Sequence, residues 1–395
     1  MKINFGKKTI VAGAVVSSLL AVVLLANAVF AATTTWTVSD ANLKVSGSTT
    51  CFPIFSYVLG LQQGATYGRG TGGTFQQNKA GASTIVADLE QSSSGQGLSD
   101  TTALNGDLGL SSSINSALLP LPSNVTMTEF ARDGVCIIAN SSVTGTANIT
   151  FDEIARIFGS VSGQSAITTW SSMHITSSTD NIVVFGRQSG SGTEDTINKC
   201  IAGGGFSGWT DNNSNITRET SSALLLAAVS STPGAIGYES YGYVSQYLGT
   251  NVLFSISPDS ANWTYPYTNT SSYVAPTAQS ITSTSYPLAR TLKFLKNTTP
   301  STNSDNANLL ISYTLSRLGQ DDVEHCGFVK LNPDADVNAD GHINISDVGS
   351  IGTKWLQSGA PGFCAQDVNQ DGHVNISDIG KIGQWWLISY TRIGS

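Results

Sequence analysis

Between residues 42 and 320, short apolar runs alternate with helical stretches and turn-rich segments. The ranges 151–158 and 221–229 place apolar residues three or four apart, as helices do, and Thr150 stands where an N-cap is expected. Three runs have the length and composition of buried strands: Leu43–Val45, Gly134–Ile138 and Ile182–Phe185. This alternation favours an α/β fold over a β-sandwich.

The N-terminus has the pattern of an export signal. Lys2, Lys7 and Lys8 precede an apolar run from Thr9 to about Ala32 that ends in small residues. We therefore predict that residues 1–32 are a signal peptide, and that the chain is secreted or held at the cell surface. The run is also close to the span of a bilayer, so an uncleaved N-terminal anchor is the alternative.

Charge is unevenly distributed over the 395 residues. Only 12% of them are charged, and the net charge is −8. From Asp321 to the end there are ten acids and four bases, so most of the excess negative charge lies in this tail. Such a balance argues against a general nucleic-acid binder, which needs a basic surface.

The acidic tail contains a duplicated twelve-residue segment, 336–347 and 367–378. Repetition at this fidelity indicates two copies of one structural unit. Each copy has oxygen-bearing side chains at positions 1, 3 and 5, Gly at 6 and Asp at 12, which is the spacing of a calcium loop. The His at position 7 contributes through its backbone carbonyl. The predicted ligands of the two Ca²⁺ ions are Asp336, Asn338, Asp340, His342 and Asp347 in one loop, and Asp367, Asn369, Asp371, His373 and Asp378 in the other.

A short helix is predicted after each loop, with one apolar stripe in each copy. The stripes are Val348, Ile351, Trp355 and Leu356 in the first copy, and Ile379, Ile382, Trp385 and Trp386 in the second. A loop followed by one helix, twice, resembles the dockerin family over about residues 333–388. The resemblance implies a compact domain that binds two Ca²⁺ ions and docks onto a cohesin domain of another protein. Loop positions 10 and 11, which largely set partner choice in that family, are Ile345, Ser346, Ile376 and Ser377.

The body carries turns suited to binding an anion. Gly47–Pro53 and Gly186–Thr193 are rich in small and hydroxyl residues, and each follows a predicted strand and opens a helix. Unpaired backbone N–H groups at a helix N-terminus favour an anion, and Arg187 adds a guanidinium four residues before Ser191. The range 68–73 is a third candidate.

These turns resemble motifs of the phosphate-binding proteins that serve ABC transporters. The matching segments are Gly47–Thr50 before Phe52–Pro53, Arg187–Thr193, Pro233–Tyr238, Leu98–Asp100 and Tyr286–Arg290. The resemblance covers about residues 42–320 and implies a type II periplasmic-binding-protein fold of two α/β lobes, one of them at about 128–235. It also implies that phosphate lies between the lobes, held by Thr50, the backbone at Cys51, Thr71, Asp100, Arg187, Ser191, Gly192 and Thr193.

Asp100 is the residue that would distinguish phosphate from sulfate. A carboxylate in an anion site repels its ligand unless the ligand brings a proton, as HPO₄²⁻ does and SO₄²⁻ does not. The alternative is that Asp100 caps a helix that begins at Thr101. Departures from the family pattern at Cys51 and Ser189 leave another tetrahedral oxyanion open as the ligand.

Cysteines and glycosylation sequons are consistent with export. We favour a disulfide between Cys326 and Cys364, which flank the acidic repeats. Sequons for a glycoprotein occur at Asn124, Asn140, Asn148, Asn212, Asn215, Asn262, Asn269 and Asn297.

An enzyme is not indicated. Of the four His, His342 and His373 belong to the predicted calcium loops, and neither they nor His174 and His325 have the spacing of a Ser–His or catalytic-metal cluster. We therefore predict an extracellular solute-binding protein that captures phosphate and is tethered through its dockerin to a cohesin protein, with an ABC permease as a further partner. The alternative is a glycosylated surface, matrix or adhesion protein that uses the same fold without transport.

Overall fold

The computed structural model describes residues 42–60, 72–76, 84–145, 147–173, 176–177, 179–257 and 273–393. The predicted export segment 1–32, the predicted ligand Thr71 and the sequons at Asn262 and Asn269 lie outside these described residues.

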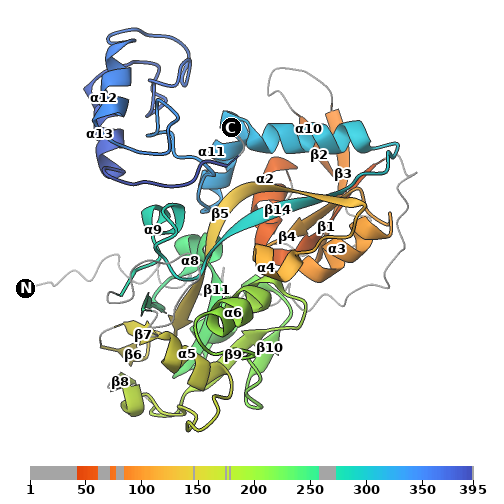
Figure 1. The fold of residues 1–395 in the computed structure, drawn as a ribbon, viewed down its shortest axis with the longest axis vertical. Helices are drawn as coiled ribbons and strands as arrows, with labels where there is room; N and C mark the ends of the chain where they lie inside the picture. The colour runs from red at the N-terminus through yellow and green to blue at the C-terminus, as the bar shows by residue number, and fades with distance from the viewer. Residues whose placement is uncertain are drawn as a thin grey trace, which may run out of the picture.

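A mixed sheet runs through the body and joins its two halves (Figure 1). Its strand order is β10-β9-β11-β5-β14-β4-β1-β3-β2, and β12 pairs with β5. The long strands β5 and β14 are antiparallel neighbours at the centre and cross from one half to the other. The strands of this sheet are β1 (Leu43–Ser48), β2 (Gly72–Gln76), β3 (Thr84–Ser92), β4 (Leu108–Ser111), β5 (Val125–Ala139), β9 (Val183–Arg187), β10 (Thr217–Glu219), β11 (Ala235–Ser240), β12 (Val252–Leu253) and β14 (Ala289–Asn297).

Helices cover the sheet in both halves. One half has a 3₁₀ turn η1 (Thr49–Cys51), α2 (Phe52–Val58), α3 (Ser94–Thr102), α4 (Asn115–Leu118), α10 (Ser304–Leu315) and α11 (Arg317–His325). The other has α5 (Phe151–Phe158), η2 (Ser171–Met173), α6 (Gly192–Gly203), α7 (Ser222–Ser231), α8 (Tyr241–Tyr247) and α9 (Ala278–Thr282). It also has two small sheets, β6 (Val143–Thr144) with β8 (Thr176–Ser177) and β7 (Asn148–Thr150) with β13 (Ser255–Ser257).

Each half has its own hydrophobic core. In the first half, the rings of Phe55, Phe130 and Phe294 pack together with centroids 4.5 to 5.3 Å apart. In the second, α5 packs its apolar face inward, and Phe158 lies edge-on to Tyr238. Burial of large apolar side chains in two separate places stabilises two halves that meet along β5 and β14.

The local elements predicted from the sequence are confirmed. Helix α5 spans Phe151–Phe158, and Thr150 caps it: its hydroxyl accepts the Glu153 backbone N–H while the Glu153 carboxylate accepts the N–H of Thr150. The three expected strand runs fall within β1, β5 and β9 except for Ile182, which immediately precedes β9. The α/β class is therefore correct.

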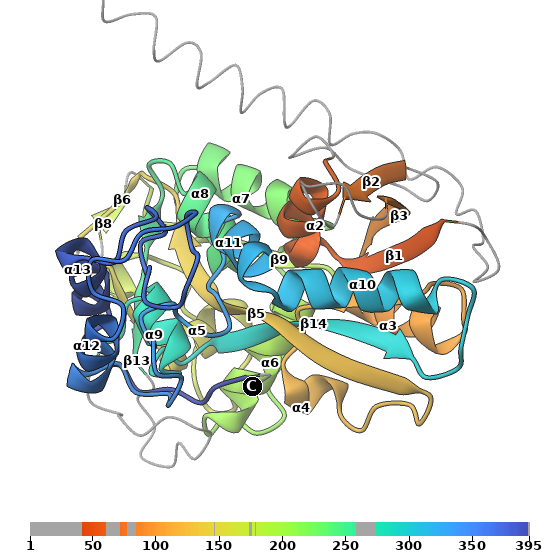
Figure 2. The same cartoon turned by 90° about the horizontal axis from the view of Figure 1, so that it is seen from above.

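The acidic tail forms a small helical unit at the end of α11 (Figures 1 and 2). It holds α12 (Ile345–Gly352) and α13 (Ile376–Gln384), which pack through Ile351 and Ile382 around its own small core. The predicted apolar stripe is only partly buried, because Leu356 is 75% exposed and Trp386 is 44% exposed. These residues follow the last helical turn instead of facing the core.

The expected disulfide is absent from the structure. No disulfide joins Cys326 to Cys364, so this prediction is wrong. Cys326 follows the end of α11 and turns into the core of the first half, where its Sγ donates to the Pro53 carbonyl. Cys364 lies in the tail.

Two further findings concern glycosylation and membrane-spanning helices. The sequon residues Asn140 and Asn297 are buried, and their amides donate to backbone carbonyls, so they are unsuited to carry glycans. Among the described residues, no helix is long and apolar enough to cross a membrane.

Candidate functional site

Three helices begin at the junction between the two halves. Each has a serine N-cap whose hydroxyl accepts a backbone N–H of the first turn: Ser93 for α3, Ser191 for α6 and Ser221 for α7. The Gly95 N–H of α3 donates across the junction to the Gly190 carbonyl at 3.2 Å. The positive ends of the α3 and α6 dipoles therefore meet between the halves, where they favour an anion.

The two predicted anion turns touch each other. Thr50 and Thr193 have their hydroxyl oxygens 3.3 Å apart, although 143 positions separate them in the sequence. Thr50, Cys51, Ser191 and Thr193 are all buried. The structure thus brings together the sequence-predicted residues of η1 and of the start of α6.

Arg187 lies at the end of β9 and reaches the first turn through Thr49, which the sequence reasoning did not single out. Its Nη2 donates to the Thr49 hydroxyl at 2.9 Å, and its Nη1 donates to the Ser222 hydroxyl at 2.8 Å. Nη1 is also 3.5 Å from Glu239, with both side chains buried. Glu239 is thus a buried negative partner of Arg187.

A cluster of serines completes the junction and was missed by the sequence reasoning. The Ser112 hydroxyl is 2.8 Å from that of Ser48 and 3.5 Å from that of Ser94. A Cβ at Gly192 would lie within 2.6 Å of Ser94 and Ser112, so only glycine allows this approach. The run Ser111–Ser113 directly after β4 could have signalled a third hydroxyl-rich turn.

Asp100 is placed differently from the prediction. It lies six residues after Ser94 on α3, roughly 9 Å along the helix axis. Its two carboxylate oxygens accept from the Ser46 hydroxyl at 2.9 Å and from the Gln96 amide at 2.8 Å. Helix α3 begins at Ser94, so Asp100 does not cap a helix at Thr101 either. The structure thus groups Thr50 with Thr193 and Arg187 with Thr49, and it satisfies Asp100 elsewhere.

Burial shapes the chemistry of the ionisable groups at the junction. It raises the pKa of the Cys51 thiol to about 12, so the side chain stays neutral and only the backbone is suited to an anion. Burial also raises the pKa of Glu239, while the Arg187 charge opposes that shift. Burial lowers the pKa of Lys293, whose ammonium donates to the Ser113 carbonyl, to about 7.

The two tail loops, 336–347 and 367–378, have matching hydrogen bonds, as their repeated sequence predicts. In both, Asn at position 3 contacts Asp at position 5, and Asp at position 12 accepts the N–H of the Asn at position 9. The side chains of His342 and His373 contact the hydroxyls of Ser389 and Ser358. This is consistent with the prediction that each histidine would bind Ca²⁺ through its backbone carbonyl alone. Within the described ranges, no group of three or more His, Cys, Asp and Glu side chains is arranged to hold a metal ion.

The position-1 aspartates of the loops differ. Asp336 uses Oδ2 to accept from Tyr390, Arg392 and the Gly341 N–H, and Oδ1 to accept the Asp340 N–H. Asp367 Oδ1 is buried with no hydrogen-bond partner. A buried carboxylate oxygen without a donor is costly, and a bound cation would satisfy it. The second loop therefore fits a cation on this observation.

The predicted docking residues lie on the tail surface. Ile345 and Ile376 are each 69% exposed, and Ser346 and Ser377 beside them are also exposed. Leu387 matches Leu356 in the other copy, with 73% of its surface exposed. Both copies thus present the same apolar positions to solvent.

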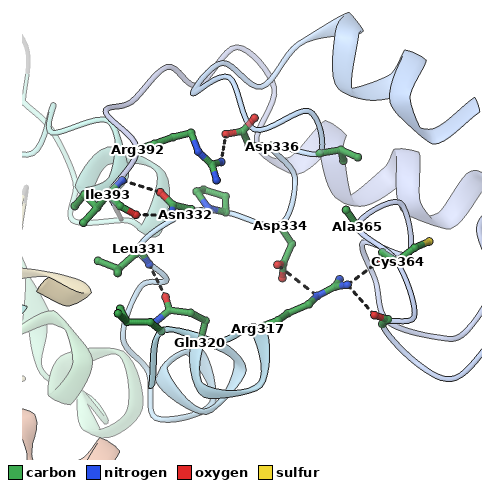
Figure 3. Close-up of a pocket in the computed structure, with 14 residues that line it drawn as sticks. Arg317, Gln320, Leu331, Asn332, Asp334, Asp336, Cys364, Ala365, Arg392 and Ile393 are labelled. Carbon is green, nitrogen blue, oxygen red and sulfur yellow. Dashed lines mark hydrogen bonds and ion pairs between the residues drawn. The ribbon is translucent and has the colours of Figure 1, made fainter. Parts of the chain in front are cut away.

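Arg317 of α11 links the body to the tail (Figure 3). Arg317 of α11 donates to the backbone carbonyls of Gly362, Cys364 and Asp367 in the second loop region. A cavity of about 460 Å³ lies between this arginine and Arg392, which pairs with Asp336. This contact is polar and reaches the backbone of Asp367, the position-1 residue of the second loop.

The fold and the junction define a class: an α/β protein with two halves joined by crossover strands and with helix N-termini between them. The chain belongs to the PBP superfamily domain family, which matches residues 32–317. No match was found among the curated proteins.

Solved structures agree on the fold. The chain is similar to a putative phosphate ABC transporter substrate-binding protein with bound phosphate from Clostridium perfringens, with a TM-score of 0.54 and 20% identity over 74% of this chain and 100% of that chain. It is also similar to an ABC-type phosphate transport receptor from Vibrio cholerae, with a TM-score of 0.50 and 18% identity over 73% of this chain and 99% of that one. A DING protein gives a TM-score of 0.51 and 14% identity over 84% of this chain and 99% of that one.

Proposed function

We propose that the body captures phosphate between its two halves, outside the cell, as the substrate-binding component of an ABC transporter. The names of the similar structures from Clostridium perfringens and Vibrio cholerae support this ligand and this role. The proposal assigns binding and no catalysis, and it includes a permease as partner. The export pattern of residues 1–32 supports the location.

The observation that carries the proposal is the meeting of the two anion turns. Thr50 and Thr193 are in contact, and Arg187 bonds Thr49 of the same first turn. Backbone N–H groups at helix N-termini, hydroxyls and a guanidinium are the groups that hold an oxyanion. The proposed ligand set is Thr50, the backbone at Cys51, Arg187, Ser191, Gly192 and Thr193, with Ser94 and Ser112 added and Asp100 left out; Thr71 stays a proposal from the sequence alone.

Titration calorimetry of the full chain with inorganic phosphate tests the proposal. The wild type should bind saturably, and Arg187→Ala should weaken binding roughly 100-fold, because a charge-assisted contact is lost. Arg156→Ala is the control, since Arg156 pairs with Asp152 on α5 and has no contact with either turn. A wild type that shows no saturable heat would favour the surface or adhesion protein instead.

The tail is proposed to be a calcium-dependent dockerin. The two loops would hold two Ca²⁺ ions through the Asp and Asn side chains at positions 1, 3, 5 and 12 and the carbonyls of His342 and His373. Bound Ca²⁺ would supply the positive charge that the loop carboxylates surround. The unpartnered Oδ1 of Asp367 supports this assignment in the second loop.

A cohesin protein is the proposed partner of the tail. The exposed residues Ile345 and Ile376, each followed by serine, support a docking face in each copy. Docking would hold phosphate capture at the cell surface or in an extracellular assembly.

Removing calcium from the full chain tests the tail proposal. A chelator should make residues 333–388 accessible to protease while the body stays resistant, because metal binding and folding are coupled in such units. Asp367→Asn should reduce the calcium stoichiometry measured by calorimetry, and Asp305→Asn, on the body helix α10, is the charge-matched control. A tail that stays equally protease-resistant with and without the chelator would contradict the calcium assignment.

A further inference from the structure

A buried ion pair links the two crossover strands. Arg290 of β14 stands directly opposite Asp133 of β5 in the strand register. Its Nε and Nη2 lie 2.9 and 2.8 Å from Asp133 Oδ2, and both side chains are fully buried. Asp133 also uses Oδ1 to accept from the Ser240 hydroxyl and the Gly242 N–H, so its orientation is fixed independently of Arg290.

The remaining donors of Arg290 point at the start of α6. Nη1 donates to the Gly192 carbonyl at 3.0 Å and to the Thr196 hydroxyl at 3.3 Å. Nη2 donates to the Thr193 hydroxyl oxygen at 3.3 Å. A strand shared by both halves therefore holds the anion turn of one of them.

The direction of the Arg290–Thr193 bond has a chemical consequence. A guanidinium has only donors, whereas a hydroxyl has one hydrogen and two acceptor lone pairs. The bond from Arg290 therefore occupies a lone pair of Thr193 and leaves its hydrogen free to donate. Thr50 is the neighbouring hydroxyl, and an anion placed between the two turns would accept that hydrogen.

We propose that Arg290, oriented by Asp133, is a positioning residue that fixes the Thr193 hydroxyl as a hydrogen-bond donor to the bound oxyanion. This inference rests on the proposed phosphate-binding function. Because the Asp133–Arg290 pair carries no net charge, it contributes to phosphate binding by orienting the Thr193 hydroxyl and not by attracting the anion. Removing both should weaken binding without changing its dependence on salt.

A double-mutant cycle on phosphate affinity tests the proposal. Removing Arg290 alone would leave a buried carboxylate unpaired, so the pair is replaced together as Asp133→Asn with Arg290→Gln. We expect this change to weaken phosphate binding about tenfold in the wild-type background. In a Thr193→Val background, the same change should weaken binding by less than about twofold, because the hydroxyl that it orients is gone.

Two controls separate this effect from general damage. Arg132→Gln removes a buried arginine of β5 that bonds the carbonyls of Leu331 and Thr391, and it should keep the affinity within about twofold. Thr193→Ser keeps the hydroxyl and should respond to loss of the pair as the wild type does. The thermal midpoint of each variant shows whether it is folded.

Wild-type affinity in the Asp133→Asn/Arg290→Gln variant would overturn the proposal. So would an equal loss in the Thr193→Val background, because Arg290 would then act without Thr193. A wild-type chain that binds no phosphate would refute the proposed function, and this inference would fall with it. The two failures are distinguished by the wild-type titration alone.

Discussion

Lys293 shows how a single buried residue couples the crossover strand to the first half. Its ammonium donates to the carbonyls of Ser113 and Thr291, at 2.8 and 2.5 Å, and its side chain is fully buried. Desolvation by burial lowers its pKa to about 7, while the charge of Glu129 opposes the shift. Near neutral pH, the folded protein therefore holds this lysine close to the point of losing its proton.

This shift predicts a pH dependence of stability. The unfolded chain keeps Lys293 protonated up to about pH 10.4, so between pH 7 and 10 it binds more protons than the folded chain. The contribution of Lys293 to the free energy of unfolding should therefore rise with pH in that window. Urea unfolding of the wild type and of Lys293→Met, measured at several pH values, isolates it, because the other titrating groups cancel in the difference. If the free energy of unfolding changed with pH equally in the two proteins, the predicted contribution of Lys293 would be wrong.

At the scale of elements, the start of α6 sets how closely the halves approach. Gly192 opens the helix with ordinary helical backbone, so a glycine is needed there for space and not for conformation. A Cβ would lie 2.4 Å from the Ser94 hydroxyl and 2.5 Å from the Ser113 backbone nitrogen, both in the other half. These contacts are shorter than packed atoms tolerate.

Gly192→Ala should therefore hold α6 away from α3 and weaken phosphate binding by about tenfold or more, since overpacking costs roughly 1–3 kcal/mol. Gly203→Ala, at the other end of the same helix, is the matched control because nothing lies within 4 Å of its Cβ position. Calorimetric titration of both variants with phosphate measures the effect. Wild-type affinity for Gly192→Ala would show that the two helix starts need not approach this closely.

For the molecule as a whole, the body and the tail meet at the crossover strand. Arg132 of β5 bonds the carbonyls of Leu331 and Thr391 and lies 5.4 Å from the ring centroid of Tyr390. Tyr390 in turn donates to Asp336 of the first loop. The next residue of β5, Asp133, holds Arg290 at the anion turns. Successive residues of one strand thus serve the two proposed sites, because side chains alternate in direction along a strand.

Local features of the body were predictable from the sequence. The capping box at Thr150, the strand runs and the hydroxyl-rich turns depend on neighbouring residues, so short-range patterns identify them. The same holds for the repeat of the tail, where Asn344 and Asn375 cap matching helices. These signals are local because hydrogen bonds within one turn of chain produce them.

Tertiary structure decided which of these groups meet. Asp100 belongs to a motif-like turn, yet its helix carries it to Ser46, and Cys326 packs into the first core instead of pairing with Cys364. Thr49 and Arg290 lie in segments that the sequence did single out, but their hydrogen-bond partners are 138 and 97 positions away along the chain. The sequence by itself determined the class of fold, the composition of the turns, rich in glycine and hydroxyl residues, and the duplicated loops. The contact between the turns was decided by the tertiary structure, in which β5 and β14 join the two halves, because strand order depends on long-range packing that no local pattern encodes.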